Sequence, residues 1–279
     1  MDERSTAPSI EEVTPERIEA VRAGTLARGL AILDVLLSAP RPMTLAEIAG
    51  VVKLDQSTTL RILRALEHTG QLIRVSDGKR YLPSPKALRP LPLLHPIEQL
   101  RREASPFLED LALEVSKTAV LVAYIGAERL VVDIAQSPGS LSPYYNNWLH
   151  GPLHGSGVGK AFLLALEPDQ RRKALGPEPY RAVTPNTITS WEDLGRDLAI
   201  AADRGFVIAR DEFYVGLTAL GANFVSWSGR IAGCIAITGH SRELDETAIQ
   251  ATGDALVRAV KLMPLQAGAL RALDQLCGR

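Results

Sequence analysis

The sequence predicts a mixed α+β chain of two domains, a small helical unit followed by a larger domain in which strands and helices alternate. Three observations support this prediction. Apolar residues recur at helical spacing from about Thr25 to His68, and a short hairpin pattern follows. Five prolines between Pro83 and Pro96 then mark a boundary. Beyond them, short apolar runs alternate with amphipathic stretches, an order typical of a sheet with helices on its faces.

Composition excludes several classes of protein. Of 279 residues, 46% are hydrophobic and 23% are charged, as in ordinary globular proteins. No apolar run is long enough to cross a bilayer, and the N-terminus lacks the apolar stretch of a signal peptide, so we expect a cytoplasmic protein without a membrane partner. The two cysteines, Cys234 and Cys277, form no CxxC pair, and the five histidines lack metal-ligand spacing. We therefore expect no metal and no cofactor.

The net charge of −1 conceals a basic segment. Between Lys53 and Arg89, eight basic side chains face only three acidic ones. Because the distribution of charge, rather than its total, indicates a surface that binds phosphate, this segment favours a nucleic-acid partner.

Three helices are expected in the first unit. The first covers about 25–39 and is ended by proline. Thr44, with Glu47 three residues later, forms the capping box of a short helix over 45–51. Asp55 is a good N-cap for the third helix, which runs to about residue 68.

The third helix has the pattern of a DNA-reading element. Thr59, Ile62, Leu63 and Leu66 give it an apolar face, and the other face is mostly polar. A helix in the major groove must present polar side chains from its first turns; glutamine can bond adenine, arginine can bond guanine, and an apolar side chain can contact the thymine methyl group. The residues expected on this outward face are Gln56, Ser57, Leu60, Arg61 and Arg64.

Two further features would contact the DNA backbone. Ser57 and Thr58 stand at the helix start, where free amides suit a phosphate. An Asp-Gly turn within 76–79 predicts a two-stranded hairpin, and Lys79 and Arg80 at that hairpin would reach phosphate or the minor groove. Three helices and a two-stranded wing make a winged helix-turn-helix. The alternative is a solvated amphipathic helix in an all-α unit, but the ordered set of capped helices and wing favours DNA binding.

The sequence predicts four segments. They are a mobile acidic tail over 1–23, the winged helix-turn-helix domain over 24–89, a linker helix within 90–105 and a sheet domain over 106–279. A new helix is expected to start at Ser105-Pro106, with serine as N-cap and proline as first residue. In the sheet domain, strands are predicted over 119–125, 130–134, 206–209, 217–224 and 231–238, helices from about 159, over 191–204 and over 243–263, and a loop over 137–154.

Several blocks in order resemble the IclR-type transcriptional regulators, from about residue 25 to 262. The blocks are Thr25–Leu33, Met43–Ala49, Ser57-Thr58 followed by Arg61–Leu63, Leu153–Ala161 (LHGSGVGKA), Thr187–Thr189, Asp211–Gly216 and Ile235–Gly239. The resemblance implies a repressor or activator, for instance of a catabolic operon, whose GAF-like domain binds a small organic acid. Such proteins are usually homodimers, often dimers of dimers, on palindromic double-stranded operators, and the linker helix and first helix commonly supply the dimer contacts.

In the family, the effector lies against the start of the helix that carries the GKA sequence. Carried over here, the backbone of Ser156, Gly157 and Val158 would bind an anionic group, since unpaired amides and the helix dipole favour negative charge. The residues expected near or opposite them are His154, Arg210, Ala219, Ala236 and Thr238.

This sequence departs from the family at those positions. The segment that begins with Ala209-Arg210 has acidic residues in many members of the family. Ala219 stands where cysteine is frequent, and Ala236 stands where serine is frequent. We therefore predict an aromatic or otherwise apolar carboxylate, clamped by Arg210. The loop residues Tyr144, Tyr145 and Trp148 would line its site. The alternatives are a surface ion pair of Arg210 with Asp211 or Glu212, core or dimer packing for the aromatic loop, and a structural role for His154 at the helix start.

Enzyme patterns fit less well. The segment 155–160 resembles a phosphate-binding loop, but His154 stands where its first glycine should be and Ala161 replaces the magnesium ligand. No GxSxG elbow exists, and Asp211 and Glu212, as neighbours on a strand, would point to opposite faces. The rival functions are a small-molecule enzyme on the same sheet domain and a protein-binding adaptor whose winged helix no longer contacts DNA.

Overall fold

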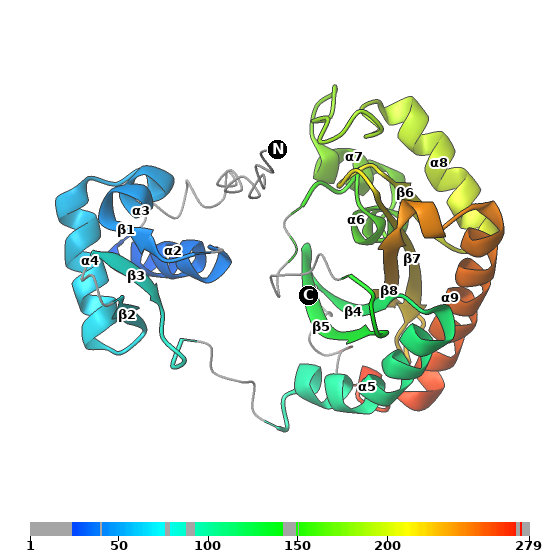
Figure 1. The fold of residues 1–279 in the computed structure, drawn as a ribbon, viewed down its shortest axis with the longest axis horizontal. Helices are drawn as coiled ribbons and strands as arrows, with labels where there is room; N and C mark the ends of the chain where they lie inside the picture. Colours follow the sequence, from blue (N-terminus) through cyan, green and yellow to red (C-terminus); the bar gives the residue numbers. More distant parts are fainter. Residues whose placement is uncertain are drawn as a thin grey trace. The chain divides into compact units, whose positions relative to one another are not determined.

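The computed structural model describes residues 24–39, 41–75, 79–87, 93–141, 149, 151–271 and 274. Several features expected from sequence lie outside these residues: the tail 1–23, the Asp77-Gly78 turn, part of the proline-rich boundary, Cys277, and the aromatic residues Tyr144, Tyr145 and Trp148. The chain divides into two compact units between residues 90 and 91, one position from the expected domain boundary. Figure 1 labels their helices and strands, and each unit is described by itself.

The first unit contains three helices and a small sheet. Its elements are α2 (Thr25–Ser38), β1 (Met43–Thr44), α3 (Leu45–Val52), α4 (Gln56–His68), β2 (Leu72–Arg74) and β3 (Arg80–Pro83). The expected two-stranded hairpin is confirmed, since β2 and β3 pair antiparallel. The sequence did not predict β1, which adds a third strand to give the order β1-β3-β2. Thr44 pairs with Arg80, and Met43 pairs with Tyr81 while burying its side chain. A two-residue strand is too short to show the alternation by which strands are recognised.

Both N-caps predicted in the first unit are confirmed. The Thr44 hydroxyl accepts a hydrogen bond from the Glu47 amide at 3.3 Å, and the Glu47 carboxylate accepts one from the Thr44 amide at 2.7 Å. Hydrogen bonds from Arg41 and Thr44 lower the pKa of Glu47 to about 2. Asp55 accepts a bond from the Thr58 amide at 2.8 Å, which fixes where α4 begins.

The core of this unit holds the three helices and the sheet together. Ile32 of α2, Ile48 of α3 and Leu63 of α4 are fully buried, and Leu72 of β2 is nearly so. They belong to one hydrophobic cluster with Tyr81 of β3. Because α4 is held by its apolar face, its orientation within the unit is fixed and its other face remains in solvent.

The second unit begins with one long helix. The expected break at Ser105-Pro106 is wrong, since α5 runs without interruption over Pro96–Val115 with Pro106 inside it. Proline removes one helical hydrogen bond, but buried residues on both sides of it pack against the same sheet. Leu100, Ala104, Leu108 and Leu111 form that buried stripe. The boundary predicted between a linker helix and the sheet domain therefore falls within a single helix.

A five-stranded antiparallel sheet forms the centre of the second unit. Its strands are β4 (Thr118–Ile125), β5 (Glu128–Gln136), β6 (Val207–Arg210), β7 (Leu217–Val225) and β8 (Ile231–His240), in the order β5-β4-β8-β7-β6. The other helices are α6 (Gly157–Leu164), α7 (Pro168–Leu175), α8 (Trp191–Arg204) and α9 (Glu246–Gln266), with a 3₁₀ turn over Ser241–Glu243. All five predicted strands and the helix over 191–204 are confirmed.

Helices cover both faces of this sheet (Figure 1). Helices α5 and α9 pack on one face, against residues such as Leu121 and Ile235. Helices α6 and α8 pack on the other, against Val120 and Ala236. Successive side chains of each strand thus pack into hydrophobic cores on opposite faces of the sheet. We call the face that carries α6 and α8 the α6 face.

Helix α7 has no counterpart among the sequence predictions. Its sequence is mostly charged, and none of its residues is buried, so it lacks the apolar stripe by which helices are recognised. None of the helices in the described ranges combines the length and apolarity that spanning a bilayer requires.

Replacing Asp55 with alanine tests the structural basis of α4. Removing the cap leaves the Thr58 amide without its acceptor, which costs about 1 kcal/mol of helix stability. We expect hydrogen exchange of the α4 amides to accelerate about fivefold. Gln56→Ala, a change at the neighbouring exposed position, serves as the control and should leave exchange unchanged. Equal exchange rates in both variants would contradict the assigned cap.

Candidate functional site

Helix α4 presents the face that the sequence predicts. Thr59, Ile62 and Leu63 are buried. The residues expected to read DNA lie on the remaining surface: Gln56, Ser57, Arg61 and Arg64 are exposed, and Thr58 and Leu60 are partly exposed. The chain therefore places the six side chains on the accessible part of a helix whose other side is anchored in the core.

The two arginines of this face are available to a partner. Within the described part of the chain, neither Arg61 nor Arg64 makes a hydrogen bond or an ion pair. Being three residues apart, they are neighbours on the helix surface. By contrast, Arg74 lies against the Tyr81 ring and pairs with Glu67 at 3.1 Å, so it serves the unit's own structure.

The wing places two further cations at the surface. Arg80 is the first residue of β3 and Lys79 directly precedes it, and both are exposed. The turn that would carry them toward DNA lies outside the described residues.

In the second unit, the start of α6 is where the sequence predicts an anion site, and the structure describes how this helix end is capped. Ser156 is the N-cap: its hydroxyl accepts from the Gly159 amide at 3.1 Å and donates to the Pro152 carbonyl at 3.1 Å. The amides of Gly157 and Val158 begin the helix, and among the described residues they find no acceptor. Such amides, with the helix dipole, attract an anionic group.

Glycines let α6 lie directly on the sheet. A Cβ atom on Gly157 would come within 3.0 Å of the Ala219 Cβ, and one on Gly221 would come within 2.8 Å of the Gly157 carbonyl oxygen. A larger side chain at either position would push the helix away from β7. The close approach brings the two free amides against the strand that carries Ala219.

The sheet opposite these amides is lined by small apolar side chains. Ala209 pairs with Ala219 in the register of β6 and β7, and Ala219 pairs with Thr238 of β8. Ala236 lies two residues before Thr238 and therefore on the same face. All are buried except Ala219, which is partly so. The structure thus brings Ala219, Ala236 and Thr238 together on the face that carries α6, as predicted.

Arg210 lies on the other face, which corrects the prediction that it clamps a carboxylate. Its guanidinium donates to Glu246 at 2.8 Å and to the Leu244 carbonyl at 3.3 Å, at the start of α9. The reason is strand alternation: Ala209 faces α6, so its neighbour Arg210 must face away. The surface ion pair named as the alternative does form, but with Glu246 in place of Asp211 or Glu212.

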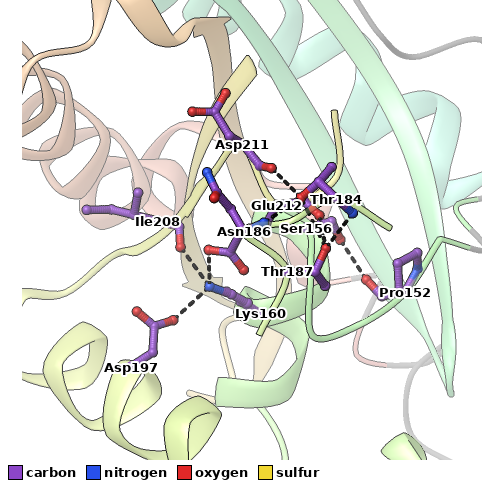
Figure 2. Close-up of polar contacts among 10 residues, drawn as sticks. All are labelled: Pro152, Ser156, Lys160, Thr184, Asn186, Thr187, Asp197, Ile208, Asp211 and Glu212. Carbon is purple, nitrogen blue, oxygen red and sulfur yellow. Dashed lines mark hydrogen bonds and ion pairs between the residues drawn. The ribbon is translucent and has the colours of Figure 1, made fainter. Parts of the chain in front are cut away.

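The sequence does not reveal that the side chain of Lys160 forms a buried ion-pair cluster beneath α6 (Figure 2). Its side chain is completely buried, and its ammonium group donates to Asp197 at 2.9 Å, Glu212 at 2.6 Å and the Ile208 carbonyl at 3.0 Å. Burial raises the pKa of Glu212, and the nearby Lys160 charge opposes that rise. Since all three donors of the lysine are used within the fold, it is not placed to bind a phosphate.

The turn after β6 is fixed from several sides. Asp211 has a positive φ of 56°, and its carboxylate accepts from the Gly216 amide at 2.6 Å and the Ser241 hydroxyl at 2.7 Å. Thr187 donates to the Glu212 carbonyl at 2.7 Å. Asp211 and Glu212 thus lie in the turn after β6 and not on a strand, which corrects the expectation from sequence. Their carboxylates hold different partners, since Glu212 accepts from Lys160.

His154 takes a structural position beside α6. Its Nε2 lies 2.9 Å from the Arg181 carbonyl, which can only accept, so this nitrogen carries a proton. Its ring lies 5.2 Å from the Tyr180 ring, and burial lowers its pKa. The ring therefore bridges the segment before α6 and the segment around residue 180.

The fold defines a class of protein: a helix-turn-helix unit with a basic outward face, followed by an antiparallel sheet domain with helices on both faces. Family models agree. The model "IclR helix-turn-helix domain" matches residues 25–75, and "Bacterial transcriptional regulator IclR C-terminal" matches residues 96–263. The chain belongs to the IclR family of bacterial transcriptional regulators.

Individual relatives support this assignment. The chain is 26% identical to the transcriptional repressor IclR of Escherichia coli, over 88% of this chain and 91% of the relative. It is 32% identical to the HTH-type transcriptional regulator Rv1719 of Mycobacterium tuberculosis, over 71% and 75%. Its fold is similar to that of an IclR homologue from Microbacterium hydrocarbonoxydans crystallised with 4-hydroxybenzoate, with a TM-score of 0.71, 24% identity and coverage of 89% and 100%.

Replacing Lys160 with methionine tests the buried cluster. The change leaves Glu212 and Asp197 without their cation, and breaking a buried ion pair costs about 3–5 kcal/mol. We expect the urea midpoint of the second unit to fall sharply, and Glu212→Gln in the same chain to restore part of it. Lys173→Met, at an exposed position of α7, is the control. A midpoint equal to that of the control would contradict the structural role.

Proposed function

We propose that this regulator binds double-stranded operator DNA through α4 and that a small organic acid at the N-terminus of α6 controls the binding. The observation that carries the first part is the outward face of α4. Arg61 and Arg64 stand there without partners in the described chain, on a helix whose apolar side is buried. A groove-binding helix requires this division into one anchored and one free face.

Base recognition would fall to a few side chains. Gln56 suits adenine, Arg61 suits guanine, and the partly exposed Leu60 suits a thymine methyl group. Ser57 and Thr58 would position the helix on a phosphate, with Lys79 and Arg80 of the wing on the neighbouring backbone. We propose a homodimer on a palindromic operator of a catabolic operon, since two copies double the site that one short helix can read. The protein would act in the cytoplasm, where its DNA is.

An apolar carboxylate fits the effector site best. The free amides of Gly157 and Val158 supply the attraction for the anion. Two of the side chains opposite them, Ala219 and Ala236, are alanines where the family often has polar residues, so this part of the wall suits an aromatic or aliphatic body. The Microbacterium homologue binds such an acid, 4-hydroxybenzoate, which supports this class of ligand. With Arg210 directed at α9, backbone amides rather than a guanidinium would hold the carboxylate.

Replacing Arg61 with alanine tests the DNA-binding role. Loss of a bidentate guanine contact should weaken specific binding by about 1–3 kcal/mol, or roughly fivefold to 150-fold. The measurement is fluorescence anisotropy on the DNA upstream of the protein's own gene, at several salt concentrations. Arg196→Ala removes the same charge from an exposed site of the second unit and should have no effect. Indistinguishable affinities for the two variants would rule out Arg61 as a base-reading residue.

Replacing the two alanines opposite α6 with the polar residues that the family often has tests the proposed class of effector. We expect the wild-type chain to bind benzoate more tightly than pyruvate in calorimetric titrations. In the double variant Ala219→Cys, Ala236→Ser, new hydrogen-bonding groups should shift the preference toward pyruvate, roughly tenfold for about one added hydrogen bond. Ala222→Ser, on the opposite face of β7, is the control. A wild-type chain that binds pyruvate but no aromatic acid would contradict the proposal.

A further inference from the structure

A buried carboxylate oxygen of Glu212 has no hydrogen-bond partner. The other oxygen, Oε1, accepts from the Lys160 ammonium at 2.6 Å. Oε2 is out of contact with solvent, and no donor among the described residues reaches it. The residue as a whole is only 7% exposed. An ionised oxygen that is buried without a donor is costly, and a proton on the carboxylate removes most of that cost because it removes the charge.

The cluster around this oxygen holds more negative than positive charge. Lys160 is its cation, and the carboxylates of Glu212 and Asp197 both accept from it (Figure 2). With both acids ionised, the cluster therefore carries one net negative charge. The Asp197 side chain is 26% exposed, so water solvates its charge, whereas burial raises the pKa of Glu212. Of the two acids, Glu212 is the one on which a proton is favoured.

The other titratable groups of the elements packed around Glu212 are engaged elsewhere or neutral. The Asp211 carboxylate holds the backbone of its own turn. The Arg210 guanidinium points to the other face of the sheet, toward α9. On α8, Arg204 donates to the Phe206 carbonyl. Burial lowers the pKa of His154, in the segment before α6, so its ring is neutral at physiological pH.

The cluster lies close to the proposed anion site. Lys160 follows Val158 by two residues in the first turn of α6, so its backbone is about 3 Å further along the helix axis. Glu212 reaches the same segment from the turn after β6, since a Cβ atom on Gly155 would come within 3.4 Å of the Glu212 carbonyl oxygen. A net negative charge here opposes an anion at the helix start, because charges in a protein interior are weakly screened.

We propose that an anionic effector at the N-terminus of α6 binds together with one proton, which Glu212 takes from solvent onto Oε2 and releases when the effector leaves. The proposal deepens the proposed function and rests on the effector site described there. The bound anion adds a negative charge near the carboxylate and so favours its protonated form. By linkage, the proton strengthens binding of the anion to the same extent. Effector affinity therefore falls as the pH rises through the range in which Glu212 loses its proton, by up to about tenfold per pH unit, and is constant outside that range.

The experiment is calorimetric titration of the full chain with benzoate in two buffers, Bis-Tris and imidazole. These buffers are cationic, so they do not compete for an anion site, and their different ionisation enthalpies reveal the number of protons taken up. We expect uptake of up to one proton per bound benzoate, with a maximum between about pH 5.5 and 8, and an affinity that falls toward higher pH. Benzoate itself stays ionised throughout this range. The same measurements apply to pyruvate if that is the acid that binds.

Variants of the cluster identify the group that takes up the proton. Glu212→Gln keeps an oxygen for Lys160 but binds no proton, so the uptake should vanish and the affinity should no longer change with pH. Asp197→Asn removes the competing negative charge, so the uptake should persist and move to lower pH. This shift decides the question if Glu212→Gln does not fold. Glu192→Gln, which removes an exposed acid from α8, is the matched control and should keep the wild-type profile.

The outcomes distinguish this proposal from the effector site itself. Binding without proton uptake at any pH, or uptake that persists in Glu212→Gln, overturns the role of Glu212 and leaves the effector site standing. Uptake that is lost in His154→Gln and retained in Glu212→Gln assigns the proton to the histidine and likewise overturns it. Absence of binding by both benzoate and pyruvate overturns the anion site and, with it, the linked proton.

Discussion

The structure of the second unit depends on one buried cation. The ammonium group of Lys160 joins three elements that are distant in sequence: α6, which carries it, α8 through Asp197, and the end of β6 with the following turn through Ile208 and Glu212. A buried charge is costly unless it is paired and fully hydrogen-bonded, and here each ammonium donor has an acceptor. The cluster therefore requires these elements to be assembled together, which makes the position of α6 specific rather than one of several similar packings.

The buried ion pairs of Lys160 also fix where the N-terminus of α6 lies against the sheet. Once Lys160 holds α6 and glycines permit contact with β7, the amides of Gly157 and Val158 have one position relative to the sheet. An anion at those amides must then contact the sheet residues opposite them. The same constraint reaches the preceding segment, because Ser156 caps α6 while bonded to Pro152. The start of α6, its cap and residue 152 thus form one connected structure.

Sequence reasoning succeeded where a local rule applies. Capping chemistry located α3 and α4, because Thr44, Glu47 and Asp55 act within three residues of themselves. Apolar periodicity found the strands of the sheet and the outward face of α4. Family resemblance then placed Ala219, Ala236 and Thr238 around the start of α6, and the register of the sheet agrees.

Sequence reasoning failed where partners are distant or signals are short. Nothing near Lys160 in sequence shows that it is buried, since its acidic partners are 37 and 52 residues away. The face of the sheet to which Arg210 points depends on its exact position in a strand of only four residues, because side chains alternate between the two faces. The strand Met43–Thr44 is too short to show any alternation of apolar and polar residues. Pro106 was expected to start a helix because proline favours that position, but packing of both halves on one sheet outweighs that preference.

We propose that the exposed face of α4 is the surface that meets DNA. Hydrogen–deuterium exchange of the full chain, with and without the DNA upstream of its own gene, tests this most directly. We expect DNA to slow exchange of the backbone amides over the first turns of α4, around Gln56–Arg61, and to leave exchange within α9 unchanged. DNA-dependent protection confined to the second unit, with α4 unaffected, would contradict it.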